Sequence, residues 1–253
     1  MIPSRKERLN RSELLLGADV LERLGSVRVI LFGVGGVGSW CAEGLVRSGV
    51  RHLTLVDADA VAPSNIHRQR VATVPTVGRP KVEVLKEMLL EIDPEAEITA
   101  LQRRFTAADA ASFNLDSYDY VLDAIDALSD KAALILAATA SKATFFSSMG
   151  AACKVDPTKI RVADFWNVRG CPLGFLLRKK LRKAGTLPAK PFLCVYDEEL
   201  LPNRGEDTAL PEELKFDKKS HNGSLVTVTA PFGFTLASLV ISDVTTGNPG
   251  KYP

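Results

Sequence analysis

The chain of 253 residues contains only four cysteines, and no two of them form a C-x-x-C pair. They stand far apart, as Cys41, Cys153, Cys171 and Cys194. Because a zinc site of the ribbon type needs paired cysteines, the sequence argues against this class of structural metal site. Scattered, unpaired cysteines are typical of reducing compartments, so we expect a cytoplasmic protein.

A strong net charge and a clear membrane segment are also missing. The formal charge is +2, which neither demands nor excludes a nucleic-acid partner. The first residues carry charges but no apolar stretch of the secretory type. The nearest approach to a membrane segment is 224–244, which Pro231 and Gly233 interrupt. Since a spanning helix needs ~20 mostly apolar residues, we expect no span and predict a buried strand-turn-helix here.

Short apolar runs alternate with helical patterns through the first 150 residues. The expected strands are 28–32, 52–57, 96–102, 118–123 and 144–148, and the expected helices are 37–48, 80–92, 106–112 and 129–142. This alternation predicts an α/β fold with a Rossmann-like, mostly parallel sheet and helices on both faces. We expect one domain over 1–253, with a nucleotide-binding core at 28–148 and a smaller C-terminal extension of the same core at 149–253. In that extension we predict a strand at 160–165, a basic helix at 172–183 and a mobile loop at 201–222, which is rich in charge, proline and glycine.

A glycine-rich segment, G-x-G-G-x-G, follows the first expected strand and opens a helix. Its glycines are Gly33, Gly35, Gly36 and Gly38. Glycines let the backbone approach a phosphate closely, and the helix N-terminus offers free N–H groups to an anion. Asp57 ends the second expected strand, where an acidic side chain is placed to bind ribose hydroxyls. These features predict a bound nucleotide and fit NAD as well as ATP.

Residues just downstream favour a triphosphate over a dinucleotide. Asn65, Arg68 and Lys81 follow Asp57 closely, and cations near the carboxyl ends of strands suit the larger charge of ATP. Each of these residues taken alone is also compatible with a solvated surface. Asp123 and Asp126 close the fourth strand, where one carboxylate is placed to hold Mg²⁺ against the phosphates. Asp126 is alternatively a cap of the following helix.

Taken in order, these segments resemble the ThiF/MoeB/HesA family of adenylating proteins. The resemblance rests on the glycine segment, D-x-D at 57–59, S-N-x-x-R-Q at 64–69, V-G-x-x-K at 77–81 and D-x-x-D at 123–126. It implies that Asp57 holds the ribose and that Asp59 lies in the same nucleotide site. It further implies that Asn65, Arg68 and Lys81 hold the phosphates and that Asp126 works with Mg²⁺. A family arginine that reaches the partner's ATP across a homodimer matches Arg11, with Arg8 as the second choice.

The second half of the chain is similar to one branch of that family, the tRNA threonylcarbamoyladenosine dehydratase group. Its segments are 147–152, 154–158, 162–164 and 171–173, and the paired cysteines of carrier-protein activators are absent. The resemblance implies that the enzyme adenylates the threonyl carboxylate and that the carbamoyl group then closes a ring. It also implies a monovalent cation, Na⁺ or K⁺, and a sulfur-transfer partner. Two alternatives stay open: an activator of a ubiquitin-like or sulfur-carrier protein, and a non-catalytic or NAD-binding protein.

Two features of the second half bear on the substrate. The expected helix at 172–183 carries the candidate tRNA-binding residues Arg178, Lys179, Lys180, Arg182 and Lys183. They are placed to pair with RNA phosphates, although a solvated helix face is the better explanation when this helix is considered by itself. Cys171 precedes this helix, where free N–H groups favour a thiolate. A cyclising enzyme does not need that nucleophile, so we expect Cys171 to be a packing residue.

Overall fold

The computed structural model of the chain describes residues 3–205 and 222–247. Within these residues seven strands form one sheet in the order β3-β2-β1-β4-β5-β7-β6. The strands are β1 (Arg28–Phe32), β2 (His52–Val56), β3 (Glu97–Leu101), β4 (Tyr120–Asp123), β5 (Thr144–Ser148), β6 (Ile160–Asp164) and β7 (Leu193–Asp197). Five of the six neighbouring pairs are parallel, and only β6 and β7 run antiparallel. The predicted mostly parallel sheet is confirmed, and β6 matches the strand predicted at 160–165. The strand β7, which lies between β5 and β6, was not predicted.

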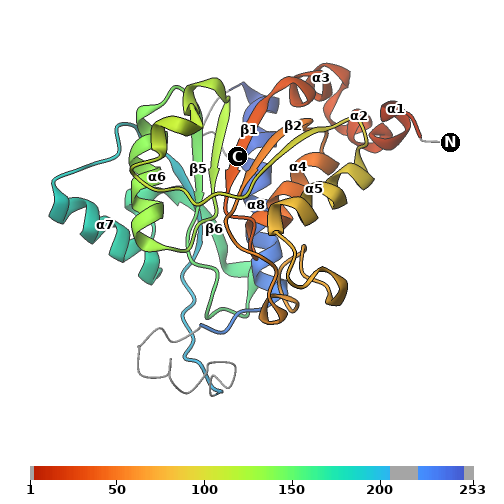
Figure 1. Cartoon of the computed structure of the whole chain (residues 1–253). Coiled ribbons are helices and arrows are strands. Elements are labelled where there is room, and N and C mark those ends of the chain that lie inside the picture. The colour runs from red at the N-terminus through yellow and green to blue at the C-terminus, as the bar shows by residue number, and fades with distance from the viewer. Residues whose placement is uncertain (1–2, 206–221, 248–253) are drawn as a thin grey trace.

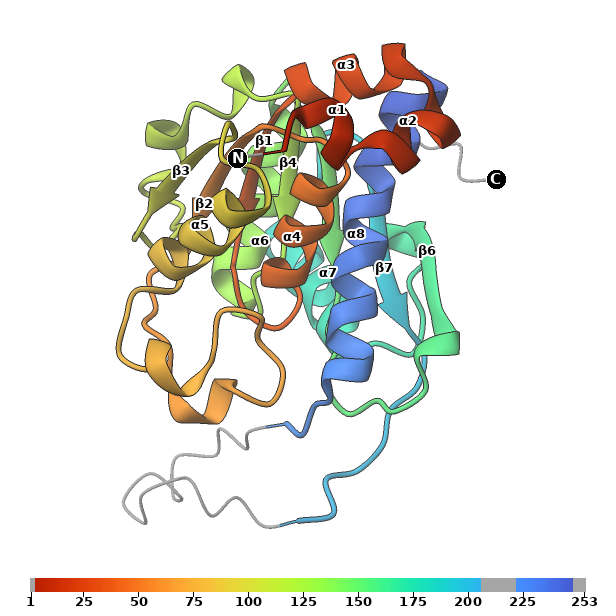
Figure 2. The same cartoon turned by 90° about the vertical axis from the view of Figure 1, so that its right-hand side faces the viewer.

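Helices cover both faces of this sheet (Figure 1). One face carries α4 (Gly38–Arg47), α5 (Lys81–Ile92) and α8 (Val226–Thr246), and the other carries α6 (Leu128–Ala140) and α7 (Pro172–Ala184). The N-terminal helices α1 (Arg5–Arg8), α2 (Asn10–Leu16) and α3 (Ala18–Ser26) lie at one end of the sheet (Figure 2). The segment 57–80 extends from the opposite end, where the parallel strands finish.

The apolar runs of the sequence explain why the central strands form. Residues 29–32 of β1 are fully buried, as expected for a parallel strand covered on both sides. On α5 the buried face includes Val82, Leu85 and Leu89, which lie three or four residues apart. Pro80 precedes the first turn of α5, where its missing N–H costs little. Local sequence and tertiary packing agree in this part of the fold.

The helix predicted at 106–112 is wrong. A turn precedes the short 3₁₀ helix η3 (Ala110–Phe113) here, and a second one, η4 (Leu115–Ser117), follows after the left-handed residue Asn114. Thr106 donates its hydroxyl to the Asp109 carboxylate, and Ser112 donates to the Asp109 carbonyl. Such local side-chain bonds compete with helical backbone bonds, and only Phe113 of η3 is buried. The remaining short helices are η1 (Pro63–Asn65), η2 (Val74–Thr76), η5 (Pro157–Lys159) and η6 (Phe165–Asn167).

The strand-turn-helix predicted at 224–244 is also wrong, because α8 is one continuous helix that contains Pro231. Val228, Phe232, Leu236 and Val240, spaced four residues apart, are fully buried in the core. This stripe packs against α4, β5 and β7, and its burial outweighs the strand preference of the β-branched residues before Pro231. By length and composition α8 passes a test for a membrane span, but half of its tested window is buried inside the protein.

The predicted mobile loop at 201–222 falls almost entirely on residues 206–221, which lie outside the described residues. Among the described residues on either side, the Asn203 side-chain oxygen accepts a hydrogen bond of 2.9 Å from the Gly223 N–H.

Candidate active site

The glycine segment forms the turn between β1 and α4, at the carboxyl edge of the sheet. Gly33 has φ +86°, and a Cβ there would lie 2.7 Å from the Ala124 carbonyl oxygen. A Cβ on Gly38 would lie 1.8 Å from the Gly33 carbonyl oxygen. Protein packing alone therefore requires glycine at these two positions. At Gly35 and Gly36 a Cβ would meet no atom closer than 3.4 Å, so the space beside them is compatible with a ligand that approaches the backbone.

Two buried polar atoms beside this turn have no hydrogen-bond partner within the described part of the chain. They are Gln69 Oε1 and Thr229 Oγ1. Gln69 lies next to Gly35, and Thr229, from the first turn of α8, lies next to Gly36. Unsatisfied buried polar groups are costly in a folded protein and are expected where a ligand completes their bonds. The sequence reasoning missed Thr229 because it placed this residue in a strand.

The carboxylates at the end of β2 organise the turn and the next helix. Asp57 accepts one hydrogen bond of 2.8 Å from the Val34 N–H and another of 2.9 Å from the Asp59 N–H. Asp59 in turn forms an ion pair with Lys81, with 2.8 Å between Oδ2 and Nζ. The Lys81 side chain is 7% exposed, whereas that of Asp59 is 70% exposed. The predicted residues Asp57, Asp59 and Lys81 thus lie together, and Lys81 is held from within the protein.

Arg68 supplies a cation beside the glycine turn. Its Cδ would lie 3.5 Å from a Cβ on Gly36, and its backbone carbonyl accepts a hydrogen bond of 3.0 Å from the Trp40 indole N–H. Burial lowers the pKa of the Arg68 guanidinium, and the Asp126 carboxylate opposes that shift. In the described part of the chain Arg68 has no salt-bridge partner within 4.0 Å. A half-buried cation that lacks a salt-bridge partner in the described residues is suited to bind an anionic ligand.

Asn65 stabilises the loop that carries Arg68. It is buried, and its side-chain oxygen accepts a hydrogen bond of 3.0 Å from the Ala62 N–H. The Asn65 carbonyl also accepts bonds from the Arg68 and Gln69 N–H groups. Asn65 therefore shapes the loop that carries Arg68, and its amide nitrogen is left for a further contact.

The two carboxylates after β4 differ sharply in their surroundings. Asp123 is fully buried, pairs with Lys131 at 2.7 Å, and accepts hydrogen bonds from the Ser147 hydroxyl and the Ile125 N–H. Lys131 also donates to the Ile125 carbonyl at 2.9 Å. Asp123 therefore braces the loop, and only Asp126 is exposed toward a ligand. Asp126 does not cap α6, because Ala127 is the N-cap and no side chain caps that end.

The buried Lys131–Asp123 pair was not predicted. The sequence did offer a signal for this pair, because Lys131 is the lone charged residue of the otherwise apolar stretch 131–138. No group of three or more potential metal-ligating side chains occurs in the described residues. A metal ion at Asp126 would therefore need ligands from the nucleotide phosphates as well.

Comparison with known proteins defines the family of this chain. The profile of the ThiF family matches residues 9–246. This chain belongs to the ThiF family. A tRNA threonylcarbamoyladenosine dehydratase of Escherichia coli (strain K12) is 34% identical over 248 residues, which cover 92% of this chain and 91% of that protein. The same enzyme of Bacillus subtilis (strain 168) is 42% identical over 176 residues, with 70% and 69% covered.

Solved structures of ThiF-family proteins agree with this assignment. The crystal structure of the E. coli dehydratase in complex with ATP has a TM-score of 0.84 and 31% identity, and 98% of each chain is covered. The molybdopterin-synthase adenylyltransferase of E. coli is 35% identical, but only over 151 residues, or 59% of each chain. Similarity to the carrier-protein activators is thus confined to part of this ThiF-family chain.

The helix α2 of this ThiF-family chain carries Arg11 far from the site. Within one protomer α2 lies at the end of the sheet opposite the segment 57–80 (Figure 2). Arg11 is exposed, as are its neighbours Leu14 and Leu15, which are 78% and 82% exposed. Arg8 is instead engaged with Asp93, at 2.7 Å, so Arg11 remains the better candidate for a contact in trans.

The predicted basic helix is α7, and its five cations are not equivalent. Arg178 is half-buried and donates a hydrogen bond of 2.9 Å to the Phe165 carbonyl. Arg178 therefore has a structural contact, and its role in tRNA binding stays a prediction. The other four are exposed: Lys179, Lys180, Arg182 and Lys183.

Cys171 is the N-cap residue of α7 and is buried at 4% exposure. It lies in the apolar cluster that also contains Leu177 and Met149. This position agrees with the expected packing role and leaves the thiol poorly accessible to a substrate.

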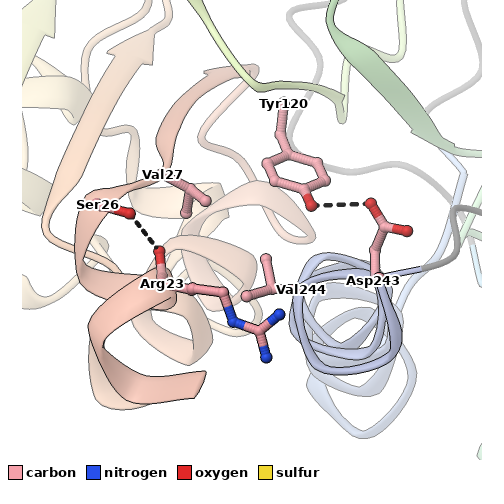
Figure 3. Close-up of a pocket in the computed structure, with 7 residues that line it drawn as sticks. Arg23, Ser26, Val27, Tyr120, Asp243 and Val244 are labelled. Carbon is pink, nitrogen blue, oxygen red and sulfur yellow. Dashed lines mark hydrogen bonds between the residues drawn. The ribbon is translucent and has the colours of Figure 1, made fainter. Parts of the chain in front are cut away.

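A cavity of about 310 Å³ lies elsewhere, at the amino end of β4 (Figure 3). Tyr120 donates a hydrogen bond of 2.8 Å to Asp243, and burial raises the pKa of both side chains. The lining residues are Arg23, Ser26, Val27, Tyr120, Asp243, Val244 and Gly247. None of the predicted site residues is among them, so this cavity is separate from the glycine turn.

Proposed function

We propose that this ThiF-family chain is an ATP-dependent enzyme that adenylates the carboxylate of threonylcarbamoyladenosine in tRNA and cyclises it. The carboxylate attacks the α-phosphorus of ATP, and pyrophosphate leaves. The carbamoyl group of the same molecule then attacks the activated carbonyl and AMP leaves, so the nucleoside loses one water overall. The observation that carries this proposal is the similarity to named dehydratases along nearly the whole chain, together with the site at the glycine turn.

The chain's own residues support the adenylation step by alignment and charge. We expect free N–H groups at the end of the glycine turn and at the α4 terminus to bind a phosphate. Lys81 and Arg68 are held near that turn and compensate the charge that develops as pyrophosphate leaves. Thr229 offers a hydroxyl that lacks a partner among the described residues. No covalent enzyme intermediate is needed, because the substrate carries its own second nucleophile.

Asp126 is the residue that we propose for Mg²⁺. It is exposed at the carboxyl edge of the sheet and lies close enough to Arg68 to influence its pKa. Bound there, Mg²⁺ would neutralise phosphate charge. A monovalent cation, a sulfur-transfer partner and a cytoplasmic location are further proposals that rest on the family resemblance alone.

The nucleoside product tests the proposed reaction. Purified protein is incubated with ATP and with tRNA that carries threonylcarbamoyladenosine, and the digested nucleosides are analysed by mass spectrometry. We expect the modified nucleoside to lose one water only when ATP is present. A modified nucleoside of unchanged mass, with a folded protein that binds ATP, would contradict the proposal.

We propose a homodimer, because the family resemblance gives Arg11 a role at an ATP site and helix α2, which carries Arg11, lies at the opposite end of the sheet from the chain's own site. Exposed Leu14 and Leu15 beside it provide an apolar surface for a second copy. We expect mixtures of Arg11→Ala and Lys81→Ala chains to regain activity, because one site of each mixed dimer keeps both groups. If exchanged subunits never complement each other, Arg11 does not act in trans.

The alternative function is activation of a ubiquitin-like or sulfur-carrier protein. It shares the adenylation site, and the partial similarity to the molybdopterin-synthase adenylyltransferase favours it. The two functions differ in which substrate stimulates the release of pyrophosphate.

A further inference from the structure

An exposed tryptophan lies beside the basic helix α7. Trp166, in the short helix η6, is 38% exposed, and the Arg182 guanidinium from the end of α7 lies over its ring at 5.0 Å. Arg182 is itself exposed. The indole is therefore held in place but still reachable from solvent, together with the guanidinium that covers it.

Contacts of the helix η6 hold Trp166 beside α7. The Asp164 carboxylate caps η6 and accepts a hydrogen bond of 2.9 Å from the backbone N–H of Trp166. Phe165 meets the indole edge-on at a centroid distance of 5.1 Å, and Arg178 donates to the Phe165 carbonyl, which ties η6 to α7. A rigid aromatic side chain loses little conformational entropy when a ligand binds to it.

The helix α7 beside Trp166 carries charge of one sign, and the nearby Asp164 carboxylate is engaged with the backbone N–H of Trp166. The helix α7 carries five cations and no anion, and in the described part of the chain none of the five forms a salt bridge. Exposed Lys179 and Lys183 lie on the same helix as Arg182. An anionic polymer whose flat rings can stack is the chemical complement of this surface.

We infer that Trp166 and Arg182 form a stacking platform for an unpaired base of an RNA whose phosphates lie along α7. This inference rests on the proposed function, since tRNA is the RNA in question. The helix α7 begins next to its N-cap Cys171, whose Sγ would lie 3.8 Å from a Cβ on Gly150, just past the carboxyl end of β5. From this edge of the sheet α7 runs for ~20 Å. Trp166 follows the antiparallel strand β6 and therefore lies toward the opposite edge, beside Arg182 in the last turn of α7. An RNA bound along the whole of α7 would thus extend from the platform to the edge that carries the nucleotide site.

A lipid surface is the competing partner, because Phe175 and Leu176 on α7 are also exposed. An interfacial helix inserts its apolar face into the membrane. The apolar face of α7, with Leu177 and Leu181, is instead buried in the core. The observations favour RNA.

Equilibrium binding of a fluorescently labelled tRNA transcript over a series of salt concentrations tests the platform. We expect Trp166→Ala to weaken binding roughly 5- to 150-fold, the effect of losing one stacked base, with no change in the salt slope. The paired variant Lys179→Ala/Lys183→Ala should instead lower the slope by about 1.4 to 1.8, because two phosphate contacts are lost. Trp166→Phe should bind nearly as wild type. Leu187→Ala removes another exposed apolar side chain, 60% exposed, and should bind unchanged.

A second variant covers the case in which Trp166→Ala does not fold. Arg182→Lys keeps the charge but loses the planar stacking group, so it should weaken binding at an unchanged slope. The inference is overturned if folded Trp166→Ala or Arg182→Lys binds tRNA within twofold of wild type. It is also overturned if anionic vesicles are bound through Trp166 while tRNA is not.

Turnover separates this inference from the proposed function. If the platform is real, Trp166→Ala raises KM for modified tRNA and leaves kcat and ATP binding alone. If the proposed function fails, no variant and no wild-type protein dehydrates the nucleoside, whatever Trp166 does.

Discussion

The two halves of the molecule hold their polar residues in different ways. In the nucleotide half, side chains such as Asp57, Asn65 and Lys81 are fixed by backbone hydrogen bonds or an ion pair. In the substrate half, the cations of α7 mostly extend into solvent, and Trp166 is only partly covered. The first half is built around one small ligand, whereas the second presents an open surface.

This difference matches what each half has to recognise. A triphosphate has one shape and a dense charge, so preorganised cations and N–H groups at fixed positions stabilise its reaction. A folded RNA presents many similar phosphates, so exposed cations bind it without fixed pairing. Changes in the nucleotide half should therefore act on stability and rate, and changes in the substrate half on binding and its salt dependence.

The largest effect expected in the nucleotide half is on stability. Lys131→Met removes the partner of Asp123, and both side chains are fully buried. An uncompensated buried carboxylate costs about 3 to 5 kcal/mol of unfolding free energy. Denaturant unfolding measures this loss, and the double variant Lys131→Met/Asp123→Asn should recover part of it. A single variant as stable as wild type would mean that this pair does not brace the site.

A slightly smaller effect is expected on the chemical step. Lys81→Ala and Asp126→Ala should each slow pyrophosphate release by ~10²- to 10³-fold, because each removes charge stabilisation of the transition state. Asp126 is exposed, and Asp59, the partner that Lys81→Ala would leave unpaired, is 70% exposed and stays solvated, so folding should persist in both variants. Circular dichroism and ATP binding serve as controls. Near-normal release by either folded variant would remove that residue from the mechanism.

The variant Thr229→Val should weaken ATP binding without lowering the unfolding free energy. The Thr229 hydroxyl is buried without a partner in the described structure, so valine should leave the unfolding free energy unchanged or raise it by about 1 kcal/mol. ATP binding should weaken by roughly threefold to tenfold, the effect of one hydrogen bond. Thermal unfolding with and without ATP measures both effects. If the variant binds ATP as tightly as wild type, the hydroxyl does not face the nucleotide.

The smallest effect is expected in the substrate half, at Cys171. Cys171→Ser should keep the dehydration rate within a few-fold of wild type, since the thiol is buried and the substrate supplies its own nucleophile. Single-turnover measurement of the product gives this rate directly. A folded, ATP-binding variant that makes no product would instead indicate covalent catalysis and favour the carrier-protein activator.

The sequence predicted the features that depend on local pattern and missed those that depend on contacts between distant segments. Hydrophobic alternation located the parallel strands β1 to β5, because a strand covered on both sides needs an apolar run, but it did not locate β7. The ordered motifs pointed to the glycine turn, Arg68, Asp57 and Lys81, and the structure places them in the loops that follow β1 and β2 at the carboxyl edge of the sheet. The ion pair of Lys131 and the hydroxyl of Thr229 were missed, since each depends on a contact between segments far apart in the chain. Helix α8 was misread because tertiary burial overrode the local preference of its β-branched residues.

Pyrophosphate release from ATP tests the central claim most directly. The purified chain is compared in three mixtures: tRNA carrying threonylcarbamoyladenosine, the same tRNA without the modification, and a carrier protein that ends in Gly-Gly, each with Lys81→Ala as the inactive control. The account predicts release that depends on the modified tRNA and that Lys81→Ala abolishes. Release driven by the carrier protein, or none with the modified tRNA, would contradict it.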